Sequence, residues 1–496
     1  MTINFKQIPA NIRVPLFYAE VDNSHANSGS INQRALIVGQ ITSSGTATAN
    51  VPVISQGVDD AKTLGGPGSM LALMVDMYRK NDNFGELWLL PLADDGAAVA
   101  AVGNISFTGP ATAAGVLSLY IAGVKVSTVV TSGMTAAQLA TALVAAINAI
   151  TDLPVTAAVN GTHAYQVDIT AKNKGPAGND IDLRLNYLGN PGGEATPAGI
   201  VATITAMASG ATAPSLTTGF ANLMDQPFDF IVFPYTDSGS LNALKSLLDD
   251  ITGRWSWDRQ VYGHAFGAYR GTVSALTTFG TGRNDQHVSI MGFNDSPTPN
   301  WLWAAAIAGV SATSLRADPG LPLQTLALEG VLPPPLASRF QLTDRNTLLF
   351  DGVSTFIVSD DGTVRIENLI TTYQQNAFGQ PDDSYLEVET LFLLMFVLRF
   401  LKTRVTSKYA RVKLAADGTR FGPGANVVTP KIIKADLIAA YRELENDGFV
   451  QNGDAFKDAL IVEKSTSNPN RVDVLWPGTL INQLRIFALL AQFRLQ

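Results

Sequence analysis

Apolar residues are most continuous in the segment 350–409, where the pattern predicts a hairpin followed by a helix. Residues 391–398 are all apolar, and a helix without a polar face must be buried within protein. The run is too short to cross a bilayer. Ser384 precedes Glu387 by three positions, which is the spacing of a capping box, so the sequence predicts that this helix begins at Ser384.

The segment belongs to a predicted C-terminal α+β domain, residues 346–496. Asp351-Gly352 and Asp361-Gly362 are typical turn dipeptides, and the second strand of the hairpin ends at Ile370–Tyr373. Farther along, residues 433–444 carry an apolar stripe at helical spacing, and residues 459–478 indicate a second hairpin.

Two stretches, 34–102 and 211–345, alternate short apolar strands with amphipathic helices. RALIVGQ and ELWLLPL are predicted strands in the first, and FDFIVFPY and HVSIMGF are predicted strands in the second. This alternation is typical of a parallel sheet covered by helices. We therefore expect one α/β domain that is split in sequence.

Residues 103–210, which separate these stretches, differ in composition. Between Ala97 and Tyr165 only Lys125 and Asp152 carry a formal charge, and Ala, Thr, Val and Gly dominate. Alternating apolar residues predict strands, and Thr135 with Gln138 predicts a capping box at the start of a helix. The stretch is expected to be an inserted β-rich domain.

Both ends of the chain resemble extended arms. In residues 1–33 apolar side chains alternate in strand fashion, but Pro9 and Pro15 exclude a central strand, so this arm is expected to lie on a sheet edge. The alternating positions are Ile12, Val14, Leu16 and Tyr18. The last residues, LINQLRIFALLAQFRLQ, fit a strand and a helix equally well.

Length and composition narrow the class of protein. A chain of 496 residues predicts two to four domains. Only 15% of residues are charged, which indicates that part of the surface is covered by assembly. A net charge of −8 argues against binding to nucleic acid. Without a secretory signal or a long apolar run, the chain is expected to be soluble, without membrane insertion, and made in a cytoplasm.

No pattern predicts catalysis, a cofactor or a metal. GxSxG is missing, the four histidines form no close pair, and cysteine is absent. Gly65, Gly66 and Gly68 precede a helix but lack the lysine of a phosphate loop, so a tight turn is the simpler interpretation. Asp237 follows a strand, where it could bind a ligand but more simply caps the next helix.

An acidic cluster in residues 443–454 imitates a calcium loop. Glu443, Glu445 and Asp447 precede Gly448, with Asp454 at the twelfth position. Glutamate replaces aspartate at the tight first positions of a calcium loop, and the preceding helix is predicted to run through Glu445. We interpret the cluster as a solvated helix end that stops at Gly448.

A basic patch follows the apolar helix. Asp417 is the only acid in a window that contains Arg399, Lys402, Arg404, Lys408, Arg411, Lys413 and Arg420. Cations at the end of a helix complement its dipole, and they can equally form a docking surface for an acidic partner. The sequence leaves both interpretations open.

The whole chain resembles the contractile tail sheath proteins of myophages, most closely the Mu-like type. The residues that carry the resemblance are the arm IPANIRVPLFYAEVDNS, the turn and helix GPGSMLALMVDMYRKN, the core DGVSTFIVSDDGTVRIENLITTY and the ending RVDVLWPGTLINQLRIFALLAQF. The α/β part of such proteins is called subtilisin-like by topology, but this chain has no matching Asp, His and Ser motifs.

The resemblance implies a structural protein rather than an enzyme. Sheath subunits stack as hexameric rings around a tail tube, between a baseplate and a tail terminator, and contraction drives the tube through the host envelope. Their terminal arms add strands to a neighbour, which favours a strand that carries Ile486, Ala488 and Leu490. The resemblance also implies location in the virion tail after assembly in the host cytoplasm. We expect the residues from Arg399 to Lys413 to face the tube and the insertion to lie outside. The alternative is a soluble α/β enzyme or ligand-binding protein with a cleft near Asp237 and Gly65.

Overall fold

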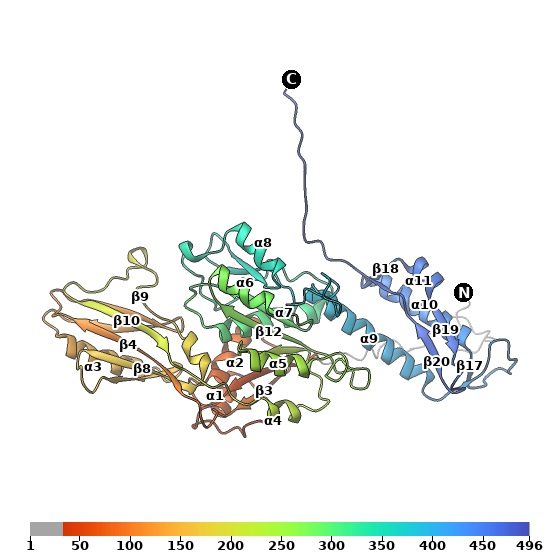
Figure 1. Ribbon diagram of the computed structural model, residues 1–496, viewed down its shortest axis with the longest axis horizontal. Coiled ribbons are helices and arrows are strands. Elements are labelled where there is room, and N and C mark those ends of the chain that lie inside the picture. The colour runs from red at the N-terminus through yellow and green to blue at the C-terminus, as the bar shows by residue number, and fades with distance from the viewer. Residues whose placement is uncertain (1–32, 496) are drawn as a thin grey trace, which may run out of the picture.

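The computed structural model describes residues 33–495, which form an elongated molecule (Figure 1). A β-rich lobe occupies one end, an α/β body lies in the middle, and a small C-terminal lobe occupies the other end. The chain is therefore a mixed α/β protein with several sheets.

The centre of the α/β body is a six-stranded sheet in the order β13-β12-β11-β1-β3-β2. Five strands are parallel, and the short edge strand β2 is antiparallel to β3. Most residues of the parallel strands are buried, as expected for a sheet covered on both faces. The strands are β1 (Ala35–Gln40), β2 (Val53–Ile54), β3 (Leu87–Leu92), β11 (Phe230–Val232), β12 (His264–Arg270) and β13 (Val288–Phe293).

Helices α2 and α7 pack against each other and against the sheet. α7 is buried on nearly all sides, and Gly309 allows the contact with α2, because a Cβ there would lie 2.8 Å from the Tyr78 carbonyl oxygen. The helices of the body are α1 (Val58–Gly65), α2 (Met70–Asn81), α4 (Thr217–Asn222), α5 (Ser238–Leu247), α6 (Val273–Thr281), α7 (Asn300–Ala317) and α8 (Leu342–Phe350).

Residues 100–208, which lie between β3 and β11 in sequence, form the β-rich lobe. Its sheets have the orders β10-β4-β8-β7 and β6-β5-β9, and the capping box of Thr135 and Gln138 at the start of α3 is confirmed. The lobe is attached to the carboxyl ends of the sheet strands, where Asp180 pairs with Arg270. Its elements are β4 (Ala100–Thr108), β5 (Gly115–Ile121), β6 (Val124–Val130), α3 (Ala136–Ala149), β7 (Val155–Val159), β8 (Gln166–Lys174), β9 (Leu183–Leu185) and β10 (Val201–Ala208).

The predicted hairpin is formed by β14 (Thr355–Val358) and β15 (Val364–Asn368). It continues the edge of the main sheet, because the Ser354 N–H donates to the Ile290 carbonyl at 2.9 Å. Phe356 and Ile366 belong to the same large core as the sheet, which extends along the chain to Met395. No packing boundary therefore separates the hairpin from the α/β body at residue 346, where the domain division was expected. The sequence placed the hairpin with the residues that follow it, but it packs with the sheet that precedes it.

The C-terminal lobe has a separate small core built around helix α10. The stripe of Ile433, Leu437, Tyr441 and Leu444 is buried there, as its spacing predicts. Tyr441 stacks on Phe456 with ring centroids 3.8 Å apart. The elements of the lobe are β16 (Lys413–Leu414), β17 (Val427–Val428), α10 (Pro430–Asn446), β18 (Val450–Gln451), α11 (Gly453–Ala459), β19 (Ile461–Lys464), β20 (Val472–Leu475) and β21 (Thr479–Leu480).

Candidate assembly surface

Helix α9 (Val388–Tyr409) connects the two cores (Figure 1). Phe392 is fully buried and stacks on Phe230 of the main sheet, whereas Val397 belongs to the small core. The apolar run 391–398 is buried or half-buried throughout, as expected. α9 therefore links the body to the C-terminal lobe.

The predicted start of this helix at Ser384 is wrong. α9 begins at Val388, and Glu387 is its N-cap residue without a side-chain capping bond. A bridge between Ile370 and Glu387 keeps Glu387 extended, and the Ser384 N–H donates to Asp382 instead. Pairing with the segment after β15 thus delays the helix by one turn.

Arg399 does not lie on the free surface of the described chain. Its guanidinium donates to both carboxylate oxygens of Asp229, at 2.7 and 2.5 Å, and both side chains are buried. Burial acts to lower the pKa of Arg399, but Asp229 outweighs it and raises the pKa. The expectation that Arg399 faces a tube is corrected, because the residue joins α9 to the start of β11.

Two other cations of the basic patch are paired within the C-terminal lobe. Arg404 contacts Asp436 at 2.9 Å and Glu443 at 2.8 Å, and Lys408 contacts Asp436 at 2.5 Å. Burial acts to raise the pKa of Asp436, but hydrogen bonds from these cations and from Tyr409 outweigh it and lower the pKa. The pairing of Arg404 and Lys408 could not be predicted from the basic window alone, because Asp436 lies outside it.

Three cations remain from the expected tube-facing set. Lys402, Arg411 and Lys413 are exposed, and none forms an ion pair with another residue in 33–495. They lie on or just after the second half of α9. Their contact with a tube stays a prediction.

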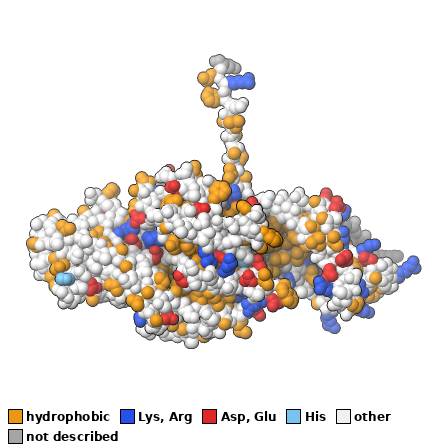
Figure 2. Space-filling view, in the orientation of Figure 1, with side chains coloured by type: hydrophobic (Ala, Val, Ile, Leu, Met, Phe, Trp, Pro, Cys, Tyr) orange, Lys and Arg blue, Asp and Glu red, His pale blue; other side chains and the backbone are white. Residues whose placement is uncertain are grey.

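The C-terminal tail, which we define as residues 482–495, leaves the body as an extended segment (Figure 1). No strand is formed at Ile486, Ala488 or Leu490 in the single chain. Figure 2 shows the tail projecting with hydrophobic side chains along its length. Large hydrophobic residues that are at least 69% exposed are Leu484, Ile486, Phe487, Leu489, Leu490, Phe493 and Leu495. The N-terminal positions Ile12, Val14, Leu16 and Tyr18 lie outside the described residues.

The base of the tail is held by an arginine. Arg485 Nη2 donates to Glu387 and to Glu389, each at 2.6 Å, although these acids precede it by 98 and 96 residues. The sequence predicted Glu387 only as a capping residue, and no pattern singled out Glu389 or Arg485. The available signals were acids at the start of an apolar helix and an arginine within an otherwise apolar ending.

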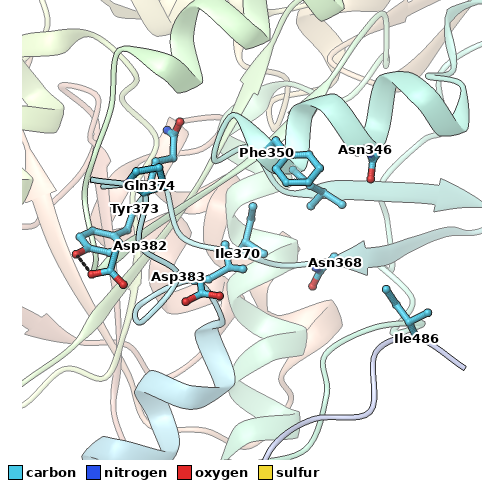
Figure 3. A pocket seen from close by; sticks show the side chains of 12 residues that line it. Asn346, Phe350, Asn368, Ile370, Tyr373, Gln374, Asp382, Asp383 and Ile486 are labelled. Carbon is cyan, nitrogen blue, oxygen red and sulfur yellow. Dashed lines mark hydrogen bonds between the residues drawn. The ribbon is translucent and has the colours of Figure 1, made fainter. Parts of the chain in front are cut away.

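A groove of about 680 Å³ lies beside the base of the tail (Figure 3). Phe350 and Asn346 of α8 form one wall, and Ile370 and Asp382 lie across from them. Ile486, the first residue after Arg485, lines the end of the groove. The tail therefore leaves the body next to an open and mainly apolar surface.

The ligand-binding alternative finds little support at the positions expected for it. The Asp237 carboxylate accepts from the Ser240 N–H at 2.9 Å, so Asp237 caps α5. Gly65 ends α1, and Gly66 and Gly68 have positive φ in the turn that leads to α2. Both observations agree with the structural interpretations of these residues.

The remaining candidate residues also have structural partners. His264 is buried and contacts Ser289 Oγ, and His287 stacks on Trp255. In the acidic cluster, α10 runs to Asn446 and Gly448 follows with positive φ, as the helix-end interpretation predicts. The described part of the chain contains no group of three or more metal-ligating side chains. Over the same residues, no helix is long and apolar enough to traverse a bilayer.

Comparison with known proteins identifies the family. Residues 209–372 match the model of the phage tail sheath protein central domain, and residues 380–494 match that of the phage tail sheath C-terminal domain. The chain is 43% identical over 495 residues to the Mu-like prophage FluMu tail sheath protein of Haemophilus influenzae, covering 99% of this chain and 100% of that protein.

Solved structures with similar chains are more distant. One is the sheath tail protein of Desulfitobacterium hafniense, with a TM-score of 0.49, 14% identity, and coverage of 95% of this chain and 97% of that chain. Another is the contracted helical sheath of the anti-feeding prophage, with a TM-score of 0.44, 13% identity, and coverage of 98% and 100%. The family models and the full-length relative are decisive: the chain belongs to the phage tail sheath family, and its role is structural rather than enzymatic.

Proposed function

We propose that this chain polymerises through its terminal arms into the contractile sheath of a phage tail. The observation that carries the proposal is the C-terminal tail, an apolar segment that is fixed at its base and exposed along its length. Full burial of one large apolar side chain contributes about 1.5–3 kcal/mol. The burial of several such residues can therefore outweigh the entropy cost of ordering a short segment when that segment adds a strand to a neighbour's sheet.

The geometry of such arms favours an open polymer. A tail given to one neighbour and a different surface that receives another tail form a heterologous contact, which repeats without closing. In our proposal six subunits form each ring, and the rings stack around a tail tube between the baseplate and the tail terminator. The N-terminal arm, with Ile12, Val14, Leu16 and Tyr18, supplies a second link.

The tube lies against the C-terminal lobe in this proposal. Lys402, Arg411 and Lys413 are the cations that remain available for an acidic tube surface, whereas Arg404 and Lys408 already have acidic partners. The β-rich lobe then lies on the outside. The subunits are synthesised and assembled in the host cytoplasm and act in the virion tail.

Contraction requires two packings of the same subunit. We infer that the extended sheath is metastable and that a trigger at one end converts ring after ring to a shorter, more stable packing. A difference of a few kcal/mol per subunit is sufficient, because many subunits convert together. The arms keep neighbours linked while the bodies rotate.

Removing residues 486–496 tests the proposal. The truncated chain should fold, since the deleted residues contribute nothing to either core, but it should not form tubes. Circular dichroism reports the fold, and electron microscopy of full-length and truncated protein at equal concentration reports assembly. Phe378→Ser removes an exposed aromatic outside the tail and serves as the control, which should still assemble. Tubes formed by the truncated chain would contradict the proposal.

A further inference from the structure

We propose that Arg485, Glu387 and Glu389 form a fixed joint that sets the direction in which the C-terminal tail leaves its own subunit. Arg485 acts in it as a positioning residue. The inference rests on the proposed function, since direction matters only when the tail reaches a neighbour. It goes further by assigning the choice of neighbour to three side chains inside the donating subunit.

The joint gathers three segments that are distant in sequence. Glu389 is fully buried, and its two oxygens have different partners: Oε1 accepts from the Leu323 N–H and Oε2 accepts from Arg485, each at 2.6 Å. Gln324 Nε2 donates to the Leu484 carbonyl at 3.2 Å. The loop after α7, the start of α9 and the base of the tail are thus connected.

Electrostatics make the arginine necessary. Glu387 and Glu389 lie side by side at the positive end of the α9 dipole, which favours acids but does not remove their mutual repulsion. Burial raises the pKa of both carboxyl groups, and Arg485 opposes that effect. Without Arg485 two like charges would remain in a desolvated site, so the cation holds the tail wherever the acids are ionised.

The joint is also the last point of attachment. Among the described residues, no hydrogen bond or ion pair involves 487–495, and Ile486 only lines the end of the groove (Figure 3). Ten extended residues span about 33 Å, so a rotation of about 20° at the joint moves the tip by more than about 10 Å. Such a displacement exceeds twice the spacing of about 4.8 Å between neighbouring strands. A loose joint would therefore bring the tail to the wrong strand position or the wrong subunit.

The absence of cysteine permits a direct measurement of the tail's direction. Spin labels are attached to Thr343→Cys on exposed α8 and Ala488→Cys on the tail of the full-length chain. Double electron–electron resonance on the monomeric fraction then gives the distribution of label distances. With the joint intact, the distribution should be narrow and single.

Four variants of the doubly labelled chain distinguish the loss of the joint from an unspecific effect of substitution in the tail. Arg485→Ala should broaden the distribution at least about twofold, because the tail is freed locally. Glu387→Gln with Glu389→Gln should broaden it as well, without leaving a buried anion. Arg485→Lys should keep it narrow, because one ammonium can replace the single nitrogen Nη2 that contacts both acids. Arg494→Ala, which removes the other arginine of the tail, should change nothing.

Two results would overturn the joint: a broad distribution in the unmutated background, or an Arg485→Ala distribution as narrow as that of Arg494→Ala. If Arg485→Ala unfolds the chain, the paired glutamine variant decides alone. The proposed function fails separately, through tube formation by the chain without residues 486–496. Such tubes would leave the distance distributions, and hence the joint, unaffected.

Discussion

The two halves of α9 are similar in length and equally helical, but the first half is mostly buried and the second half is mostly near solvent. In the first half, residues 388–399, most side chains are buried, including the charged Glu389 and Arg399. In the second half, residues 400–409, most side chains are half-buried or exposed, and Val405 is 40% exposed. One helix thus begins as a core element and ends as a surface element.

The comparison shows that charge on this helix has two different roles. In the first half each charged group has a distant partner, and the pairs fix the tail and the start of β11. In the second half the partners come from the neighbouring α10, and the pairs lie near solvent. Buried pairs are costly to break, whereas exposed pairs contribute little.

Reversing one charge in each half should give the largest contrast. Arg399→Glu sets a second carboxylate against Asp229 in a buried site, and we expect it to reduce the free energy of unfolding by about 5 kcal/mol or more. Lys402→Glu, three residues later on the exposed face, should stay within about 0.5 kcal/mol of the parent. Urea denaturation followed by circular dichroism measures both.

The same pair of variants separates stability from tube contact. Lys402→Glu should fold normally and load poorly onto an isolated tube, with polymerisation in the absence of the tube unchanged. Equal stability of the Arg399 and Lys402 variants would contradict the division of α9 into a buried and an exposed half.

Removing one aromatic ring from each core should reduce the free energy of unfolding by different amounts. Phe392 is fully buried and stacks on Phe230 at 4.9 Å, so Phe392→Ala should cost about 3–5 kcal/mol. Phe396, one turn later, is half-buried against Phe449, and Phe396→Ala should cost less. Fluorescence of Trp303 and Trp476, each retained as the only tryptophan, reports the two cores. Identical shifts of both signals in both variants would indicate one cooperative unit instead of two cores.

Apolar periodicity was sufficient to predict most elements of the fold. Strands β1, β3, β11 and β13 of the main sheet, the stripe of α10 and the capping box of α3 each depend on residues that are close in sequence. The start of α9 could not be predicted in this way. The capping box of Ser384 competes with a bridge to Ile370, and that contact exists only after the hairpin has packed.

The assembly surface was less predictable for the same reason. A basic window indicates cations, but whether a cation is free depends on acids elsewhere in the chain, such as Asp229, which is 170 residues away from Arg399. The joint of the tail combines residues from three segments, and the one motif among them, the spacing of Ser384 and Glu387, indicated a helix cap instead. The family could be identified from patterns along the whole chain. The roles of single charged residues could not, because they depend on which residues lie next to them in the folded structure.

Acidification should give the smallest effect, with opposite signs at the two ends of α9. The lowered pKa of Asp436 means that its contribution to stability is fully present above the unfolded value of about 3.9 and is lost as pH falls through the folded value. Burial raises the pKa of Glu389 despite the opposing effect of Arg485. The contribution of Glu389 to the free energy of unfolding is therefore present below pH about 4.3, its unfolded pKa, and is lost as pH rises through its folded pKa.

Asp436→Asn should therefore reduce the free energy of unfolding at pH 7, by about 1 kcal/mol or less, and the difference from the parent should vanish in strong acid. Glu389→Gln should show the reverse trend. The electrostatic part of its change in the free energy of unfolding should be least unfavourable at pH 7, because the unmutated protein then carries a buried charge that the variant lacks. Denaturation from pH 7 down to pH 2 measures both curves, and parallel curves would contradict the assignment of opposite surroundings to the two ends. Protonation of Glu387 and Glu389 weakens their attraction to Arg485 without destabilising the fold. In mild acid the tail should therefore become more mobile, while Asp436 keeps its ion pairs with Arg404 and Lys408 of α9.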